Sequence, residues 1–190
     1  MQVFETITKR RSIRRFKQDA IPLETHKKLV DAARVAPSAS NLQPLRYILV
    51  VNPDLGKEVF PTLMWAGYIA PEGNPPPGEE PTAYIVVLVN KDVARSDYQL
   101  DAGAAIENLI LTAVEEGIGS CWLGAIDRNK IREILDVSEQ FEIESVIALG
   151  YPNEEPVMEA MKDSIKYWKD ESGRLHVPKR SLEEILEIKE

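Results

Sequence analysis

The sequence predicts a single α+β domain, built from buried strands and apolar helices. Its 190 residues are enough for one hydrophobic core, and 44% apolar and 28% charged residues are ordinary values for a globular protein. The run Tyr84–Val89 is continuously apolar and rich in valine and isoleucine, which is typical of a strand buried on both faces. Leu100–Glu116 has helical periodicity, with apolar and small residues on more than one side. Together these two stretches predict a sheet packed against helices.

Composition argues against several classes of protein. The net charge of -8 and the pI near 5.0 disfavour a nucleic-acid-binding protein, because phosphate backbones attract a basic surface. No apolar run has the length of a membrane span, and residues 1–10 do not resemble a signal peptide. The single cysteine excludes an internal disulfide, and two histidines argue against a zinc site. We therefore expect a soluble, cytoplasmic protein with no metal and with neither nucleic acid nor membrane as a partner.

Two helices are predicted before residue 37. Val3–Lys9 has helical spacing, with its apolar residues on one face. The second helix begins at Pro22 and runs to about Ala36, because Pro37 disfavours a helical conformation in the residue before it.

A polar loop and a long irregular segment interrupt this regular pattern. Ser38–Pro44 carries short hydroxyl and amide side chains, and such a loop either turns the chain or binds a ligand. It leads into a predicted strand, Tyr47–Val51, and a helix from Asp54 to about Leu63. Between residues 64 and 82, five prolines and three glycines exclude regular structure. That segment is predicted to be either a lid or a disordered excursion.

The regular pattern resumes after the long helix. Gly117 is placed to end that helix as a C-cap. Strands are predicted at residues 119–125 and at Ile143–Leu149. Between them, Asp127 is placed to cap a helix that runs through Leu135.

The end of the chain has weak core character. Periodicity is lost beyond Glu155 until a capping box at Ser181–Glu184 starts a terminal helix. We expect residues 155–190 to pack on a partner subunit. The domain prediction is thus one domain over residues 1–190, with 64–82 as its lid or excursion.

A cluster of arginines near the N-terminus suggests an anion site. The stretch Arg10-Arg11-Ser12-Ile13-Arg14-Arg15-Phe16 places four guanidinium groups and a hydroxyl within six residues of an acidic chain. Each guanidinium is a permanently charged fork of donors that matches phosphate and carboxylate oxygens. The cluster therefore needs a counter-anion, either a ligand or acidic side chains of the protein.

Residues for acid–base or nucleophilic catalysis are poorly represented. The sequence contains no nucleophile elbow, zinc-protease motif, Walker loop or dinucleotide-binding glycine motif. His26 is predicted on a helix surface and His176 in the tail, each as a solvated or packing residue. Cys121 beside Trp122 is interpreted as a buried small hydrophobic residue. An anion site without acid–base residues suggests that a cofactor carries the chemistry.

Three motifs, taken in order along the chain, resemble those of the FMN-dependent nitroreductase family, and the resemblance spans nearly the whole sequence. They read Arg10-Arg11-Ser12-x-Arg14-x-Phe16; Ala36-Pro37-Ser38-Ala39-Ser40-Asn41-x-Gln43-Pro44; and Asp101-Ala102-Gly103-Ala104-Ala105-Ile106-x-Asn108-Leu109, which leads to Gly117-Ile118-Gly119-Ser120-Cys121-Trp122-Leu123-Gly124. The resemblance implies a nitroreductase-like fold, a mixed and mostly antiparallel sheet flanked by helices, in a homodimer with shared FMN sites.

The resemblance also implies roles for the arginine cluster. Arg10 and Ser12 match residues that hold the ribityl chain and phosphate of FMN, and Arg11 lies in the same motif. Arg14 matches a basic residue near the flavin N1 and O2 edge, where it would stabilise developing negative charge. No protein residue is implied as catalytic, since the flavin N5 carries the chemistry and Arg14 tunes it.

Three further places are implied to contact the cofactor. Four residues match a loop that reaches the FMN bound mainly by the other subunit: Pro37, Ser38, Ser40 and Asn41. Leu123 and Gly124, with Ala125, match the stretch whose backbone faces the N5 and O4 side, where a glycine permits close approach. Lys179 and Arg180 match a basic pair that closes on the phosphate.

The function implied is transfer of hydride and electrons from NADH or NADPH to a small organic acceptor, such as a nitroaromatic or a quinone, by a ping-pong mechanism. The enzyme class is then an NAD(P)H-dependent flavin oxidoreductase. Two alternatives stay open. One is a flavin-binding sensor or storage module without turnover; the other is a specialised flavin enzyme of the same fold, of the reductive dehalogenase type.

Other interpretations of single residues also stay open. Arg15 is expected to be a surface charge, and Arg11 has the alternative of pairing with a carboxylate. Ser38 has the alternative of ending a helix, and Asp101 is expected to be an N-terminal cap. The sequence also departs from the family, because Met64–Gly67 lacks the Asn and Lys that many relatives place on the flavin pyrimidine, and Leu123-Gly124 replaces a Glu-Gly turn.

Overall fold

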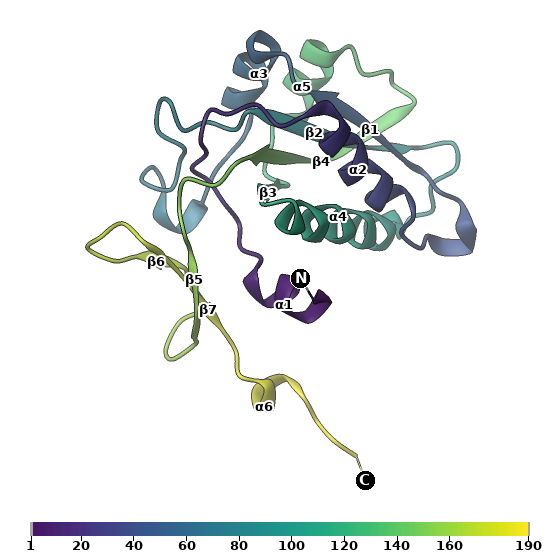
Figure 1. The fold of residues 1–190 in the computed structure, drawn as a ribbon. Coiled ribbons are helices and arrows are strands. Elements are labelled where there is room, and N and C mark those ends of the chain that lie inside the picture. The colour runs from purple at the N-terminus through teal and green to yellow at the C-terminus, as the bar shows by residue number, and fades with distance from the viewer. Residues whose placement is uncertain (1, 190) are drawn as a thin grey trace.

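The computed structural model describes residues 2–189, and its centre is a four-stranded sheet (Figure 1). The strand order is β1-β2-β4-β3, and each neighbouring pair is antiparallel. The strands are β1 (Leu45–Val50), β2 (Ala83–Asn90), β3 (Gly119–Leu123) and β4 (Phe141–Gly150). All four strands were predicted, with bounds that shift by a few residues.

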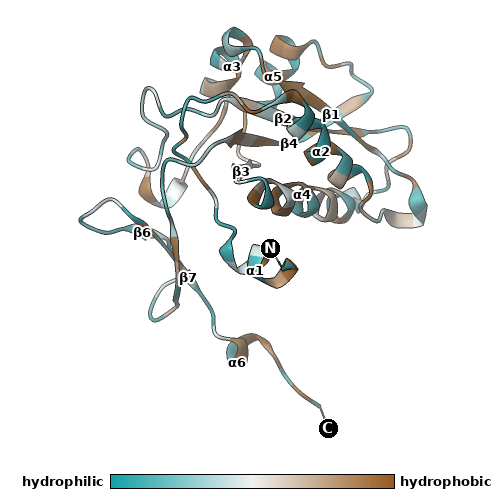
Figure 2. Cartoon of the chain, viewed as in Figure 1, coloured by the Kyte–Doolittle hydropathy of each residue, from teal (hydrophilic) through white to brown (hydrophobic). Residues whose placement is uncertain are grey.

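Helices cover both faces of this sheet. On one face lie α3 (Pro53–Val59) and α5 (Arg128–Leu135), and on the other lie α2 (Leu23–Arg34) and α4 (Tyr98–Glu115) (Figure 1). Side chains of β2 alternate between the two cores, because successive residues of a strand point to opposite faces. The strand β2 is accordingly apolar from Ala83 to Val89 (Figure 2). The predicted α+β fold with flanking helices is confirmed.

The long helix α4 is buried along most of its length. Its apolar stripe packs against α2 and the sheet, and consists of Ala102, Ala105, Ile106, Leu109, Ile110 and Ala113. Gly117 follows with a φ of +73°, a conformation that costs glycine little, and Ile118 N–H donates to the carbonyl of Ala113 at 2.8 Å. The predicted C-cap is confirmed.

The helix α1 (Val3–Lys9) is confirmed in its bounds but leaves its apolar residues exposed. Val3 and Phe4 are 74% and 76% exposed, and Ile7 is also exposed. These side chains therefore make little contact with the core of their own chain.

The chain after α1 runs along the edge of β3 and past the end of β4. Ser12 forms a parallel bridge with Ser120, and Phe16 an antiparallel bridge with Pro152. A Cβ on Gly119 would lie 2.9 Å from the Ile13 side chain, and one on Gly150 would lie 2.7 Å from Phe16. Glycine at these two positions lets residues 12–16 lie directly against the sheet.

Residues 60–82 differ in part from the prediction. The helix expected from Asp54 to about Leu63 ends at Val59, and a 3₁₀ turn at Phe60–Thr62 replaces its last part because Pro61 cannot donate a helical hydrogen bond. Beyond it, Trp65 is buried and Met64 N–H donates to the carbonyl of Ala125 at 3.0 Å. A second 3₁₀ turn follows at Gly67–Ile69. The lid role of residues 64–82 stays a prediction.

The segment after Glu155 contains a second sheet that periodicity did not predict. It has the order β5-β7-β6, with β5 (Val157–Ala160) parallel to β7 (Leu175–Lys179) and β6 (Trp168–Lys169) antiparallel to it. These strands are two to five residues long and mostly half exposed, so alternation is too short to detect.

The chain ends in α6 (Leu182–Ile185), which begins with the predicted capping box of Ser181 and Glu184. This end extends away from the main sheet (Figure 1) and exposes Leu182, Ile185, Leu186 and Ile188. Packing of residues 155–190 on a partner stays a prediction. Within residues 2–189, no helix is long and apolar enough to cross a membrane.

Candidate functional site

The arginine cluster is held in place by its two apolar residues. Ile13 and Phe16 are buried, at 8% and 0% exposure, and Ile13 N–H donates to the carbonyl of Ser120 at 2.9 Å. The polar residues between and around them are left half buried. The segment thus presents its arginines along the edge of β3.

Arg10 and Ser12 line a pocket of about 340 Å³ beside α4 and β3. The other lining residues are Glu107, Ile110, Ser120 and Trp122. Arg10 Nε lies 3.8 Å from Glu107 Oε1, beyond the range of a direct hydrogen bond. Glu107 therefore supplies part of the counter-charge and leaves the guanidinium able to bind another anion.

Arg11 turns back onto the end of α1. Its Nη2 donates to the carbonyl of Thr8 at 2.9 Å, and its Nη1 donates to the carbonyl of Arg10. Its Nε is buried and has no hydrogen-bond partner among the described residues. Burial, and then the charge of Arg10, lower the pKa of Arg11. Backbone carbonyls thus take the place of the carboxylate partner considered as an alternative.

Arg14 lies between the main sheet and the second sheet. Its backbone N–H donates to Glu154 Oε1, and its guanidinium carbon lies 5.2 Å from the centre of the Tyr167 ring. Its Nε is also buried without a partner in residues 2–189. Beside it, burial raises the pKa of the Cys121 thiol to about 11, and Arg14 opposes that shift. Cys121 is therefore the buried, unreactive residue that was predicted.

Arg15 is less exposed than expected for a surface charge. Its Nη1 lies 3.4 Å from Glu79 Oε2, and its side chain is 37% exposed. Its carbonyl accepts a hydrogen bond from Asn153 N–H at 2.8 Å. Arg15 therefore links the cluster to residues 64–82 and to the chain after β4.

The loop at residues 37–43 is fixed by Asp101 and by its own side chains. Asp101 Oδ1 accepts from Ala39 N–H at 2.9 Å, and Ser38 Oγ accepts from Gln43 N–H at 3.0 Å. Asp101 lies within the first turn of α4, not at its cap, which corrects the prediction. Ser40, Asn41 and Gln43 have positive φ angles, so the loop presents a fixed shape.

One chain does not bring all the predicted site residues together. The loop at 37–43 lies near the start of α4, whereas Arg10 faces Glu107 further along the helix. Lys179 and Arg180 are exposed at the end of β7, and Arg180 lies 4.0 Å from Glu184. No hydrogen bond or ion pair joins either group to Arg10 or Ser12 within residues 2–189. Their predicted roles at one site therefore stay a proposal that needs a second copy.

Leu123 and Gly124 lie at the end of β3 that is opposite Gly119. Leu123 is buried, and Gly124 is exposed. A Cβ on Gly124 would meet no atom within 4 Å, so this chain does not itself require a glycine there. The Gly124 carbonyl accepts from Arg128 Nη2 at 3.3 Å, which fixes the turn.

Both histidines differ from a simple solvated residue. His26, predicted on a helix surface, is 1% exposed, and its Nδ1 has no partner among the described residues. Burial lowers the pKa of His26. His176 lies in the second sheet, with Nδ1 at 2.9 Å from Glu159 Oε2 and Nε2 at 3.2 Å from Asp170 Oδ2. Neither lies in the arginine cluster, which agrees with their assignment as packing residues.

Sequence reasoning missed several residues that line or support the site. Glu107, Ser120 and Trp122 complete the pocket around Arg10, and Trp122 is 42% exposed. Ser120 and Trp122 share one side of β3, since they are two residues apart. That spacing was visible in the sequence, whereas the contacts of Glu154 and Tyr167 with Arg14 depend on the tertiary fold. Within the part of the chain described, no cluster of three or more histidine, cysteine or acidic residues forms a metal site.

Comparison with known proteins gives a consistent result. Residues 7–151 match the model of the Nitroreductase family. An Archaeoglobus fulgidus protein that carries the name of an NADH dehydrogenase/NAD(P)H nitroreductase is 34% identical over 161 residues, which are 81% of this chain and 87% of that protein. An FMN-dependent nitroreductase from Clostridium difficile has a similar solved structure, with a TM-score of 0.68 and 26% identity over 84% of this chain and 92% of the other.

Proposed function

The chain belongs to the nitroreductase family, and from this premise we propose that it moves electrons from NADH or NADPH to a small organic acceptor by a ping-pong mechanism. It is an NAD(P)H-dependent flavin oxidoreductase with FMN as its cofactor. Nitroaromatics and quinones are the acceptors that we propose. Donor and acceptor would use the same position in turn, which is the basis of the ping-pong order.

The residues of the cluster fit an anionic cofactor. The observation that carries the proposal is the pair of buried Nε atoms on Arg11 and Arg14, which have no partner among residues 2–189 and flank Ser12 in the sequence. A buried donor without a partner is costly, so the chain keeps unused hydrogen-bonding capacity at this place. Arg10 adds a third guanidinium to this group, and its Nε lies 3.8 Å from Glu107 Oε1, too far for a direct hydrogen bond.

Each group of residues would then have a separate task. FMN, when bound, supplies a ring that accepts and returns a hydride. Arg10, Ser12 and Arg11 would hold the phosphate and ribityl chain through charge-assisted hydrogen bonds. Arg14 would place a positive charge at the ring edge, where negative charge develops. Gly124, next to Leu123, would let the backbone approach the ring, because glycine has no Cβ.

We propose a homodimer because one chain leaves the site incomplete. Pro37, Ser38, Ser40 and Asn41 of a second copy would reach the cofactor, and Lys179 and Arg180 would close on its phosphate. The exposed apolar residues of α1 and of the chain end support an interface, since such a surface is seldom left to water. Light scattering after size exclusion would measure twice the mass of 21.4 kDa; a monomer that binds FMN fully would contradict the shared site.

The test of FMN binding is the visible spectrum of the purified protein, before and after addition of FMN. We expect Arg10→Ala and Ser12→Ala to lose FMN while they keep the folded state. Arg15→Ala is the matched control, because Arg15 is paired with Glu79 and is expected to leave FMN binding unchanged. Variants that do not fold would make Arg10 and Ser12 structural residues, and folded variants that keep FMN would contradict their role at the cofactor.

Turnover is tested separately. Anaerobic NADH or NADPH should bleach the flavin band, and a quinone or nitroaromatic acceptor should restore it. A flavin that is never reduced would favour the sensor or storage alternative, and a product other than the reduced acceptor would favour the specialised enzyme. Arg14→Ala should bind FMN more weakly and lower its midpoint potential; an unchanged potential would remove the electrostatic role of Arg14.

A further inference from the structure

The ring of Tyr167 covers the guanidinium of Arg14. Tyr167 is the residue just before β6, it is half buried, and its ring centre lies 5.2 Å from Arg14 Cζ. We propose that Tyr167 is a positioning residue for Arg14. The face of the Tyr167 ring holds the Arg14 guanidinium at the place where it acts on the cofactor. This inference rests on the proposed function, in which Arg14 lies at the edge of FMN.

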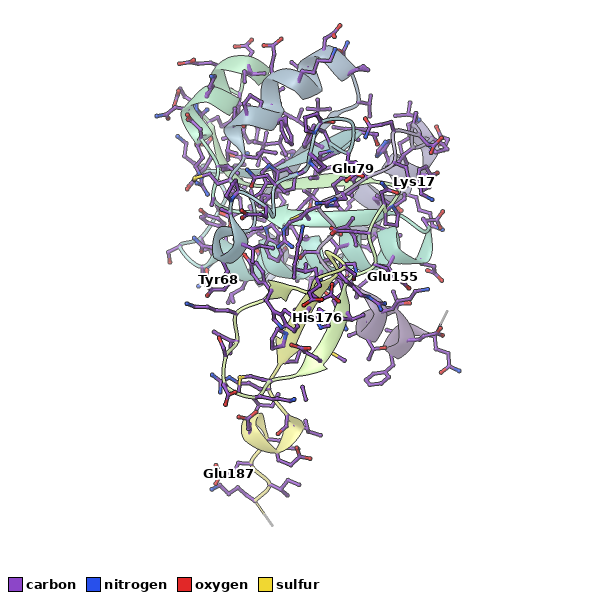
Figure 3. The ribbon with its side chains drawn as sticks, turned by 90° about the vertical axis from the view of Figure 1, so that its left-hand side faces the viewer. Lys17, Tyr68, Glu79, Glu155, His176 and Glu187 are labelled. Carbon is purple, nitrogen blue, oxygen red and sulfur yellow. The ribbon has the colours of Figure 1, made fainter. Side chains whose placement is uncertain are left out.

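A second ring supports Tyr167 from residues 64–82. The ring centres of Tyr68 and Tyr167 are 4.9 Å apart at an angle of 54°, and Tyr68 N–H donates to Tyr167 Oη at 3.4 Å. Lys166 Nζ lies 5.8 Å from the centre of the Tyr68 ring. The four side chains therefore lie in the order Arg14, Tyr167, Tyr68 and Lys166, with the two rings in contact and a cation at each end. Each cation meets a ring within the range of a cation–π interaction. Tyr68 and the second sheet lie at the same end of the molecule in Figure 3.

The charges around Arg14 explain why an aromatic ring suits this position. Arg15 and Lys169 are cations near Arg14. Burial, then the charge of Arg15 and, to a smaller extent, that of Arg14 lower the pKa of Lys169, and the charge of Glu154 opposes this shift. Repulsion from these groups would move an unsupported guanidinium toward solvent. Glu154, the nearby carboxylate, accepts from the backbone N–H of Arg14. A ring holds a guanidinium without neutralising it, so Arg14 keeps its charge for the cofactor.

The second sheet supplies the rigidity that this task requires. Trp168, next to Tyr167, donates from Nε1 to Glu159 Oε1 at 2.8 Å and stacks on His176 at 4.3 Å between ring centres. Lys169 Nζ donates to the carbonyl of Glu72 at 3.0 Å. Tyr167 is thus fixed on both sides, by strand contacts and by residues 64–82. The second sheet, β5-β7-β6, therefore holds the ring of Tyr167 over the guanidinium of Arg14.

The variants Tyr167→Phe and Tyr167→Leu separate the ring from its bulk. Phenylalanine keeps the ring face, whereas leucine keeps a large apolar side chain without one. In the protein without FMN, labelled with ¹⁵N-arginine, the Arg14 Nε–H signal is identified by its loss in Arg14→Ala. We expect its hydrogen exchange to be slow in the wild type and in Tyr167→Phe, and several-fold faster in Tyr167→Leu.

With FMN, Tyr167→Leu should raise the dissociation constant by about three- to tenfold and lower the midpoint potential in the same direction as Arg14→Ala. In Arg14→Ala/Tyr167→Leu the potential should equal that of Arg14→Ala alone, because the ring acts only through Arg14. Tyr167→Phe should behave as the wild type. If Tyr167→Leu does not fold, Tyr167→Met is the second ringless variant.

These readouts separate the inference from the proposed function. A wild-type protein that binds no FMN would contradict the proposed function, and the exchange measurement would still decide whether the ring positions Arg14. A wild type that binds FMN, with exchange and potential unchanged in Tyr167→Leu, would overturn the inference alone. Additive shifts in the double variant would also overturn it, since they would show that Tyr167 acts independently of Arg14.

Discussion

Asp101 Oδ1 accepts a hydrogen bond from the backbone N–H of Ala39, at 2.9 Å. Asp101 is 8% exposed and lies in the first turn of α4, a place where a carboxylate is also favoured by the helix dipole. Ala39 belongs to the loop that we propose to reach the FMN of the second subunit. One side chain therefore joins the core helix to the loop that we propose to cross the dimer interface.

Removal of this carboxylate should weaken both stability and cofactor binding. Asp101→Ala leaves the Ala39 N–H without its partner, and we expect a loss of about 1–3 kcal/mol in the free energy of unfolding by urea. FMN binding should weaken as well, because the loop loses its fixed position. Asp127→Ala is the matched control: Asp127 caps α5 by accepting from Lys130 N–H at 3.0 Å, so its loss should cost about 1 kcal/mol and leave FMN binding unchanged. Equal FMN binding in the two variants would contradict the role of the loop.

Substitution by alanine should have different effects on stability at Gly119 and at Gly124, which lie at and just beyond the two ends of β3. Gly119→Ala places a Cβ 2.9 Å from Ile13, so we expect about 1–3 kcal/mol of destabilisation from the forced shift of residues 12–16. In Gly124→Ala the Cβ meets open space, and stability should change little. FMN binding should nevertheless weaken in Gly124→Ala, because the added methyl group faces the proposed position of the ring. Urea unfolding and FMN titration of both variants test this; normal FMN binding by Gly124→Ala would remove the proposed close approach.

Much of the fold follows from periodicity, because the main strands and helices are long enough to show it. The strand β2 is apolar on both faces, and α4 carries a broad apolar stripe, so both could be recognised from sequence alone. His26 could not be placed, since a polar residue on a helix does not reveal that its side is covered. The second sheet was missed for a different reason: β6 has two residues, and its partners follow it only at Leu175 and His176. For the site, the motif indicated which arginines to consider, but the partners of Arg10, Arg14 and Arg15 come from distant parts of the chain.

Burial of His26 predicts a loss of stability in acid. Burial lowers the pKa of the folded His26 below the value near 6.5 of an unfolded chain. Between these two values the unfolded state binds more protons, so the stability contributed by His26 is lost as the pH falls below about 6.5. Unfolding by urea at several pH values between about 7.5 and 5 should show this decline. His26→Leu should reduce the decline; an unchanged slope would contradict the assignment.

For His176 we expect the opposite dependence of folding stability on pH. The carboxylates of Glu159 and then Asp170 raise its pKa, because an imidazolium donates to both. Its contribution is fully present below about pH 6.5 and is lost as the pH rises through the folded pKa. The chain has two histidines, so a proton NMR titration should show two C2–H signals, one moving below and one above the ordinary midpoint. His176→Gln should remove the upper transition; its persistence in that variant would contradict the assignment.

The bridges from Ser12 to Ser120 and from Phe16 to Pro152 have a consequence for biosynthesis. A ribosome releases the arginine cluster early, but the strand edge that supports it is made only after most of the chain has been translated. Until then, the four arginine side chains of the growing chain are not packed against the strand edge, and they can pair with carboxylates of the residues that follow. We therefore expect the proposed FMN site to be completed late, so that FMN binds only after the strands that support residues 12–16 have been made.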